Sequence, residues 1–230
     1  MPSGVRGQRM DEWKRRWGVG QWAAFFESQE LPVLRRSKQM LAAFEEANLG
    51  LAETETRANT AAQVAMRWAA GRNDLNPEEV AVASLLVDAG ELLLWVYEPE
   101  LPQSARDELF FGRARRSSQA QMQACGFDFK QLTIRCAELW KLPTLVVQLL
   151  RGADSPRANL TRICSNLARH IVESSDTSDL ALACDLLEVQ KLMPGASLEW
   201  LAEGLVMLPE QKRGELVELA NGRLAHSSSA

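Results

Sequence analysis

The stretch Asn76–Tyr97, NPEEVAVASLLVDAGELLLWVY, decides how the rest of the chain is interpreted. Asn76 can cap a helix, and Pro77 suits the first helical turn. From Val80 onward almost every residue is apolar, and a helix that is apolar nearly all round is typical of a buried central helix. We therefore predict one continuous helix over 76–97, ended by the two prolines that follow it.

Three polar residues interrupt this apolar run, and Ser84, Asp88 and Glu91 fall on one stripe of the predicted helix. Acids in mid-span argue against a membrane-spanning segment. Asp88 in the middle of a buried helix would be either a remnant of chemistry or a hydrogen-bonded structural carboxylate. For the pair Asp88 and Glu91 we favour a structural hydrogen bond or salt bridge over catalysis.

The segment LLVDAGELLLW, residues 85–95, resembles the LLHDIGxLLL signature of the HDOD domain, a bacterial relative of the HD metal-dependent phosphohydrolases. The order of the flanking segments is similar too: an alanine-rich helix precedes it, and CGFDF, LWKLPTLVVQLL and NLTRICSNLARHIV follow (Ala58–Ala70, Cys125–Phe129, Leu139–Leu150 and Asn159–Val172). The similarity extends over residues 20–190. It implies an HD-like helical bundle and a bacterial regulatory module.

The N-terminal part departs from the family pattern. The ELP sequence at Glu30–Pro32 resembles the start of the domain, but the usual following helices, with a DPxLxxxLLRLANS-like motif, are absent. Instead Asn48–Gly50 leads almost directly into a predicted helix over 53–70. The resemblance therefore implies a shortened N-terminal subdomain.

No stretch shows the period-two alternation of a strand, and we predict an all-α fold. The expected organisation is a flexible start (1–9), N-terminal helices (10–52), an HD-like bundle (53–174), C-terminal helices (175–224) and a flexible tail (225–230). Beside the central helix, the expected bundle helices are Glu53–Ala70, Ser104–Ala124, Phe129–Lys141, Pro143–Leu150 and Pro156–Ser174. Two or three more are expected in 180–224, separated at Pro194-Gly195 and at Pro209.

Charge and cysteine content limit the function classes. The net charge of −4 argues against a general polyanion binder. The cysteines match no CxxC metal or redox pattern and are expected to be buried thiols (Cys125, Cys136, Cys164 and Cys184). The N-terminus has no apolar secretory-signal region. These features predict a protein of the reducing cytoplasm that neither spans nor binds a membrane.

An HD hydrolase needs several imidazoles and an aspartate around one or two metal ions. This chain has two histidines in total, His170 and His226, and Val87 stands where the signature would carry its histidine. Valine cannot bind a metal, and Asp88 alone leaves a divalent cation under-coordinated. We therefore expect no metal, no cofactor, no catalytic residue and no enzymatic activity at this degenerate site.

Two further sets of residues are candidates for contacts. Arg113, Arg115 and Arg116 are expected near the middle of the helix 104–124, where a solvated face is favoured over a contact with phosphate or an acidic partner. Five aromatic residues crowd the N-terminal segment, and aromatic core packing is favoured there over an exposed docking patch (Trp13, Trp17, Trp22, Phe25 and Phe26). His170 is expected to be a surface histidine or a hydrogen-bonded structural one rather than a catalytic residue.

Together these observations favour a non-catalytic bacterial signal-transduction module that acts through protein–protein contacts. Its partner would be an unidentified protein of a signalling pathway. The N-terminal aromatic residues are the possible contact surface, and a homodimer that uses the same residues is the competing explanation. Two alternatives stay open. One is a residual phosphohydrolase or nucleotide-binding pocket around Asp88. The other is nucleic-acid binding through the Arg113–Arg116 face, which the net charge does not favour.

Overall fold

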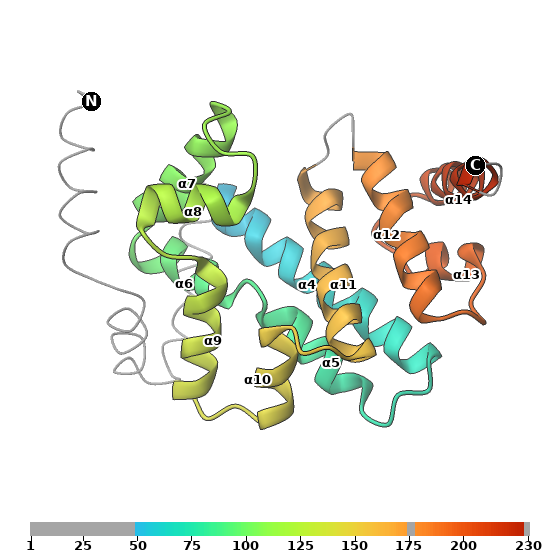
Figure 1. Cartoon of the computed structure of the whole chain (residues 1–230), viewed down its shortest axis with the longest axis horizontal. Helices are drawn as coiled ribbons and strands as arrows, with labels where there is room; N and C mark the ends of the chain where they lie inside the picture. The colour runs from blue at the N-terminus through green and yellow to red at the C-terminus, as the bar shows by residue number, and fades with distance from the viewer. Residues whose placement is uncertain (1–48, 174–177, 228–230) are drawn as a thin grey trace. The chain divides into compact units, whose positions relative to one another are not determined.

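The computed structural model describes residues 49–173 and 178–227, and every regular element in these ranges is an α-helix (Figure 1). The predicted all-α class is confirmed. The N-terminal helices expected in 10–52, with the aromatic residues between Trp13 and Phe26, lie outside the described residues. The described helices are α4 (Leu49–Gly71), α5 (Pro77–Leu86), α6 (Ala89–Tyr97), α7 (Glu100–Phe110), α8 (Ser117–Cys125), α9 (Phe129–Leu139), α10 (Thr144–Arg151), α11 (Pro156–Glu173), α12 (Ser178–Leu192), α13 (Leu198–Glu203) and α14 (Glu210–Ser227).

The described chain forms two compact units, and each is treated separately here. The first contains residues 49–55 and 87–147, and the second contains residues 56–86, 148–173 and 178–227. Helix α4 contributes its first turns to the first unit and the remainder to the second. The domain ranges expected from the sequence stay a prediction.

The first unit is built on the packing of α7 against α8 and of α6 against both α7 and α9 (Figure 1). Its core includes Leu94, Leu101 and Leu132, which are fully or almost fully buried. Local signals set the boundary between α8 and α9. Gly126 ends α8 with a positive φ of 82°, and the Asp128 side chain caps α9 by accepting a hydrogen bond from the Lys130 amide at 2.6 Å.

The second unit packs α11 against α5 and α12, and α12 and α13 against α14 (Figure 1). Its core is larger and contains Trp68, Leu167 and Leu186, all without exposed surface. The buried Trp68 indole satisfies its polar group by donating to the carbonyl oxygen of Leu201 at 3.3 Å. The second unit therefore holds a tryptophan-centred core of its own.

The single helix predicted over 76–97 is wrong, because a turn at Val87 and Asp88 divides it into α5 and α6. In a continuous helix the Gly90 amide would donate to residue 86, and the Val87 carbonyl would accept from residue 91. Instead, the Thr133 hydroxyl of α9 accepts from the Gly90 amide at 2.9 Å and lies 3.1 Å from the Val87 carbonyl oxygen, to which it donates. A side chain from another helix thus satisfies the backbone groups that the break leaves unpaired.

The helix predicted over 104–124 is also divided, and it begins earlier, at Glu100. Helix α7 ends at Phe110 in a Schellman motif: Gly112 has a φ of 67°, its amide donates to Leu109, and the Arg113 amide donates to Glu108 at 2.9 Å. The three arginines expected on a helical face therefore lie in the loop before α8.

The remaining boundaries follow the sequence signals closely. Helices α10 and α11 begin next to Pro143 and at Pro156, as predicted, and the breaks expected at Pro194-Gly195 and Pro209 separate α12, α13 and α14. At the end of α4 the left-handed residue is Asn73, with a φ of 56°. Helix α14 continues past Leu224 to Ser227.

The segment Pro77–Tyr97 is long and apolar enough to cross a membrane by length and composition, and 44% of its most apolar window is buried. Core helices of soluble proteins meet the same criterion. Here the segment is divided by the turn at Val87 and Asp88, and α5 and α6 contribute buried residues to the two cores.

Candidate functional site

The signature segment places Val87 and Asp88 in the turn before α6, and both are half-buried. Asp88 occupies the N-cap position of α6 with φ −96° and ψ 12°, and its side chain makes no capping hydrogen bond. The predicted position of Asp88 in mid-helix is therefore wrong. The backbone of this turn is held by Thr133, so the segment works as a packing element between α6 and α9.

Gly90 is where the signature makes its closest contact. A Cβ atom at this position would lie 2.7 Å from the Phe129 carbonyl oxygen and 3.0 Å from the Thr133 amide nitrogen. Both are backbone atoms at the start of α9, and they cannot move as a flexible side chain would. Glycine is thus required for the close approach of α6 to α9.

Glu91, the second acid of the signature, belongs to a polar cluster with the first turns of α4. Its Oε1 atom accepts a hydrogen bond from the Trp95 indole at 3.3 Å. It also lies 3.2 Å from the Thr54 hydroxyl, whose single proton has a nearer acceptor in the Gly50 carbonyl oxygen at 2.7 Å. The Arg106 guanidinium lies over the Trp95 ring, 5.7 Å from its centroid, and forms an ion pair with Glu53. The carboxylate of Glu91 is therefore engaged in structural contacts.

These residues do not fit a metal centre of the HD type. Val87 has no donor atom in its side chain, and its carbonyl already accepts from Thr133. No group of three or more histidine, cysteine, aspartate or glutamate side chains within the described ranges could hold a metal ion.

His170 has a partner that its own helix does not supply. Its Nδ1 atom lies 2.7 Å from Oδ2 of Asp185 on α12, and Asp185 is buried. Burial together with the charge of Asp185 raises the pKa of the nearby Cys164 thiol well above its usual range. The pair joins α11 to α12 within the second unit, a structural role like the one expected for His170.

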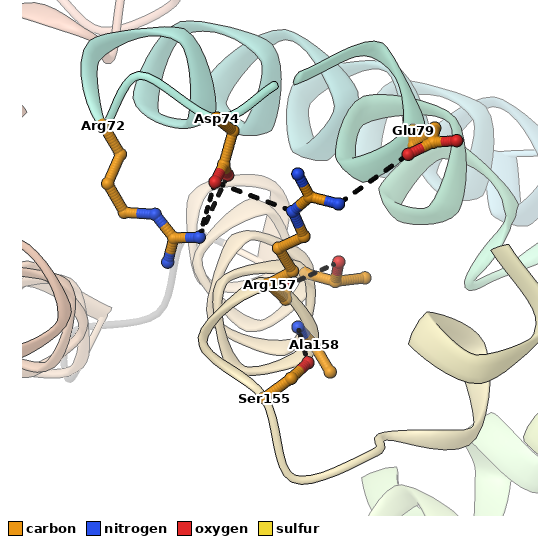
Figure 2. Close-up of polar contacts among 7 residues, drawn as sticks. Arg72, Asp74, Glu79, Ser155, Arg157 and Ala158 are labelled. Carbon is orange, nitrogen blue, oxygen red and sulfur yellow. Dashed lines mark hydrogen bonds and ion pairs between the residues drawn. The ribbon is translucent and has the colours of Figure 1, made fainter. Parts of the chain in front are cut away.

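A network of two arginines and two acids holds the α4–α5 loop against the start of α11 (Figure 2). Arg72 donates to both oxygens of Asp74, at 2.8 and 3.1 Å, and Arg157 reaches Asp74 at 3.6 Å and Glu79 at 3.8 Å. Oε2 of Glu79 is buried and accepts no hydrogen bond from the described residues, so the Arg157 charge compensates it. The sequence analysis missed this network.

The three arginines that are a possible anion contact, with a solvated face favoured from the sequence, lie in the loop between α7 and α8. Two exposed phenylalanines stand beside them, one at the end of α7 and one in the loop. Phe110 is 84% exposed and Phe111 is 62% exposed. Arg113 pairs with Glu108 at 3.0 Å and lies over the Phe111 ring. The aromatic pair directly precedes the arginines in the sequence FFGRARR, so this surface has a local sequence signal.

Comparisons with known proteins agree with this fold. The structure is similar to the crystal structure of a "putative phosphohydrolase" from Shewanella amazonensis SB2B, with a TM-score of 0.51 and 17% sequence identity. The match covers 76% of this chain and 65% of that chain, so this protein spans about two thirds of the length of its structural relative. No curated protein sequence matches.

The family comparison is more specific. The model of the HDOD domain matches residues 28–156, which is more than half of the 230 residues and includes the whole signature segment. The chain therefore belongs to the HDOD domain family.

Proposed function

We propose that this HDOD protein is a non-catalytic regulatory module of a bacterial signalling pathway, located in the cytoplasm, that acts through protein–protein contacts. The observation that carries the proposal is the state of the signature turn. Val87 replaces the metal-binding histidine of the motif, and its backbone carbonyl is used by Thr133 to hold α9. The segment keeps the packing role of the signature without its donor atoms.

The acids that remain near the signature support the same proposal. Glu91 accepts a hydrogen bond from Trp95 and lies 3.2 Å from the Thr54 hydroxyl, so its carboxylate contacts side chains of both α6 and α4. The whole chain offers two histidines, and His170 is paired with Asp185. A divalent cation that must activate water needs several such ligands and an open position.

The first test is metal content and phosphodiester turnover. Protein purified without chelator or added metal should retain less than a tenth of an equivalent of Zn, Fe or Mn after dialysis, as measured by elemental analysis. It should also not hydrolyse bis(p-nitrophenyl) phosphate in the presence of added Mn²⁺.

The matched control is Asp88→Asn, which removes the one signature carboxylate and keeps its size. One tightly held equivalent of metal, or turnover that disappears in Asp88→Asn, would establish the residual phosphohydrolase and refute the proposal. Turnover that is equal in both proteins would point to a contaminant and would leave the proposal standing.

A further inference from the structure

We propose that the aromatic–basic loop, defined as residues 109–116 from the end of α7 to the residue before α8, docks a partner protein segment that offers an apolar socket bordered by carboxylates. This inference rests on the proposed function, because it assigns the surface through which a non-catalytic module would make its protein contacts. It names the chemistry of the partner from the side chains that the loop presents.

The apolar part of the loop is large for a solvent-exposed surface. Phe110 and Phe111 stand next to each other with their rings edge to face and their centroids 5.2 Å apart, and Leu109 beside them is 38% exposed. Phenylalanine is among the aromatic residues that are enriched in the buried cores of protein interfaces. A socket that takes both rings would remove them from water.

The backbone of the loop is fixed, and this lowers the cost of ordering it on binding. The amides of Arg113 and Ala114 both donate to the Glu108 carbonyl, at 2.9 and 3.0 Å, and the Ala114 side chain is buried in the core of the first unit. The exposed rings are therefore carried on an anchored turn.

The charge of the loop determines the rest of the partner's chemistry. Arg113 is neutralised by Glu108, whereas Arg115 and Arg116 are exposed and form no ion pair with any residue in the described ranges. Two uncompensated guanidinium groups lie beside the rings, and guanidinium binds carboxylate with two parallel hydrogen bonds. Carboxylates at the border of the socket would complement them.

The number of cations favours a protein over a polyanion. Nucleic-acid binding of useful strength draws on about 6–10 phosphate contacts, and binding to anionic membranes on clusters of about 4–8 basic residues. This loop supplies two uncompensated arginines on a chain of net charge −4. It contains no lysine, and protein interfaces are enriched in aromatic residues and arginine while lysine is depleted.

Charge disfavours a dimer formed by this loop alone. Two copies of the loop packed against each other would bring Arg115 and Arg116 of both chains together, and like charges placed side by side in an interface are unfavourable. Insertion of the two rings into a concave site on another protein fits better, because a small central cluster can then carry the affinity.

The experiment uses the full chain and, as the probe, a display library of small folded peptides whose concave face is randomised, so that a selected peptide can offer a socket. Selection should enrich peptides that combine large apolar residues with aspartate or glutamate. The double variants Phe110→Ser/Phe111→Ser and Arg115→Glu/Arg116→Glu should each weaken binding of the selected peptides at least tenfold. The loss of binding caused by Arg115→Glu/Arg116→Glu should be smaller in high salt, because salt screens the charge interactions that this variant removes. Leu75→Ser is the control, because Leu75 is 91% exposed on the other unit, and binding should be unchanged.

All replaced side chains are exposed, and circular dichroism melts should confirm that each variant is folded. If the Phe110→Ser/Phe111→Ser variant unfolds at a lower temperature than wild type, the single variant Phe110→Ala is used in its place. Selected peptides that are basic, or that bind the serine variant as well as wild type, would overturn the assignment of the loop. So would loop-dependent binding to phosphatidylglycerol vesicles or to a single-stranded oligonucleotide with no peptide enriched.

Failure of this inference and failure of the proposed function give different results. Peptides that bind independently of the loop would refute the docking role of the loop. The proposal that the protein acts through protein–protein contacts would still stand. Metal-dependent turnover that requires Asp88 would refute the proposed function, whatever the loop binds.

Discussion

The Thr133 hydroxyl bridges Val87 and Gly90, donating to the carbonyl of the first at 3.1 Å and accepting from the amide of the second at 2.9 Å. One side chain of α9 thus satisfies both sides of the break between α5 and α6. In this chain the signature segment packs α6 against α9 through these contacts, which can be tested by stability measurements.

Gly90→Ala should destabilise the protein by about 1–3 kcal/mol, because the added methyl group meets backbone atoms of α9 that cannot yield locally. Chemical denaturation measures the effect. Gly214→Ala is the control: this glycine lies in α14 with open space around it, so alanine should add about 0.5–1 kcal/mol of stability. Equal effects at the two positions would contradict the close packing of α6 on α9.

Thr133→Val should cost about 1–3 kcal/mol, because it leaves the buried Gly90 amide without its acceptor while keeping the shape of the side chain. Thr133→Ser keeps the hydroxyl and should cost only about 0.8 kcal/mol, the value of one buried methyl group. The two variants are compared in urea unfolding curves. A serine variant as unstable as the valine variant would show that the methyl group, and not the bridge, holds α6 against α9.

These contacts show where sequence reasoning succeeds and fails. Gly126, Asp128 and Pro156 act on their own helix ends, and the boundaries they predict are found. The break at Asp88 depends on Thr133, which is more than forty residues away along the chain and leaves no local trace. Periodicity alone therefore predicted one long helix.

The second helix break had a local signal that was overlooked. Gly112 takes the left-handed conformation that ends α7, and a glycine inside a predicted helix is a recognised stop signal. The contact between His170 and Asp185 had no local sequence signal. Asp185 lies on the next helix, and only the packing of α11 on α12 brings the two side chains together. Local chemistry was readable from the sequence, and pairing between helices was not.

Thiol labelling should separate the four cysteines. Cys184 is exposed, whereas Cys125, Cys136 and Cys164 are buried. Burial raises the pKa of the Cys136 thiol from 9.0 to about 12, so its reactive thiolate is about a thousandfold scarcer than for an unperturbed thiol at pH 8. A thiol reagent should therefore modify one cysteine rapidly in the native protein and all four in guanidinium. Mass spectrometry that finds Cys136 modified first would contradict the buried core of the first unit.

The same burial predicts a loss of stability at alkaline pH. Below pH 9 Cys136 is protonated in both the folded and the unfolded state, and the free energy of unfolding does not depend on it. Between pH 9 and about 12 the unfolded state releases the thiol proton and the folded state retains it, so stability should fall by about 1.4 kcal/mol per pH unit at most. Cys136→Ala should show a shallower decline over this range, and Cys184→Ala should follow wild type.

The ion network around Asp74 should matter more than an exposed pair of the same charge types. The Asp74 side chain is 10% exposed and compensates both Arg72 and Arg157, so Asp74→Asn leaves two poorly hydrated guanidinium groups and should cost about 1–3 kcal/mol. The control is Glu188→Gln, which breaks an ion pair with Arg162 whose side chains are both more than 40% exposed, and it should change stability by less than about 1 kcal/mol. Urea denaturation in low and in high salt distinguishes them, because salt screens the exposed pair and affects the shielded network much less. An Asp74→Asn variant as stable as wild type would mean that the arginines are adequately solvated, and that packing alone fixes the α4–α5 loop on α11.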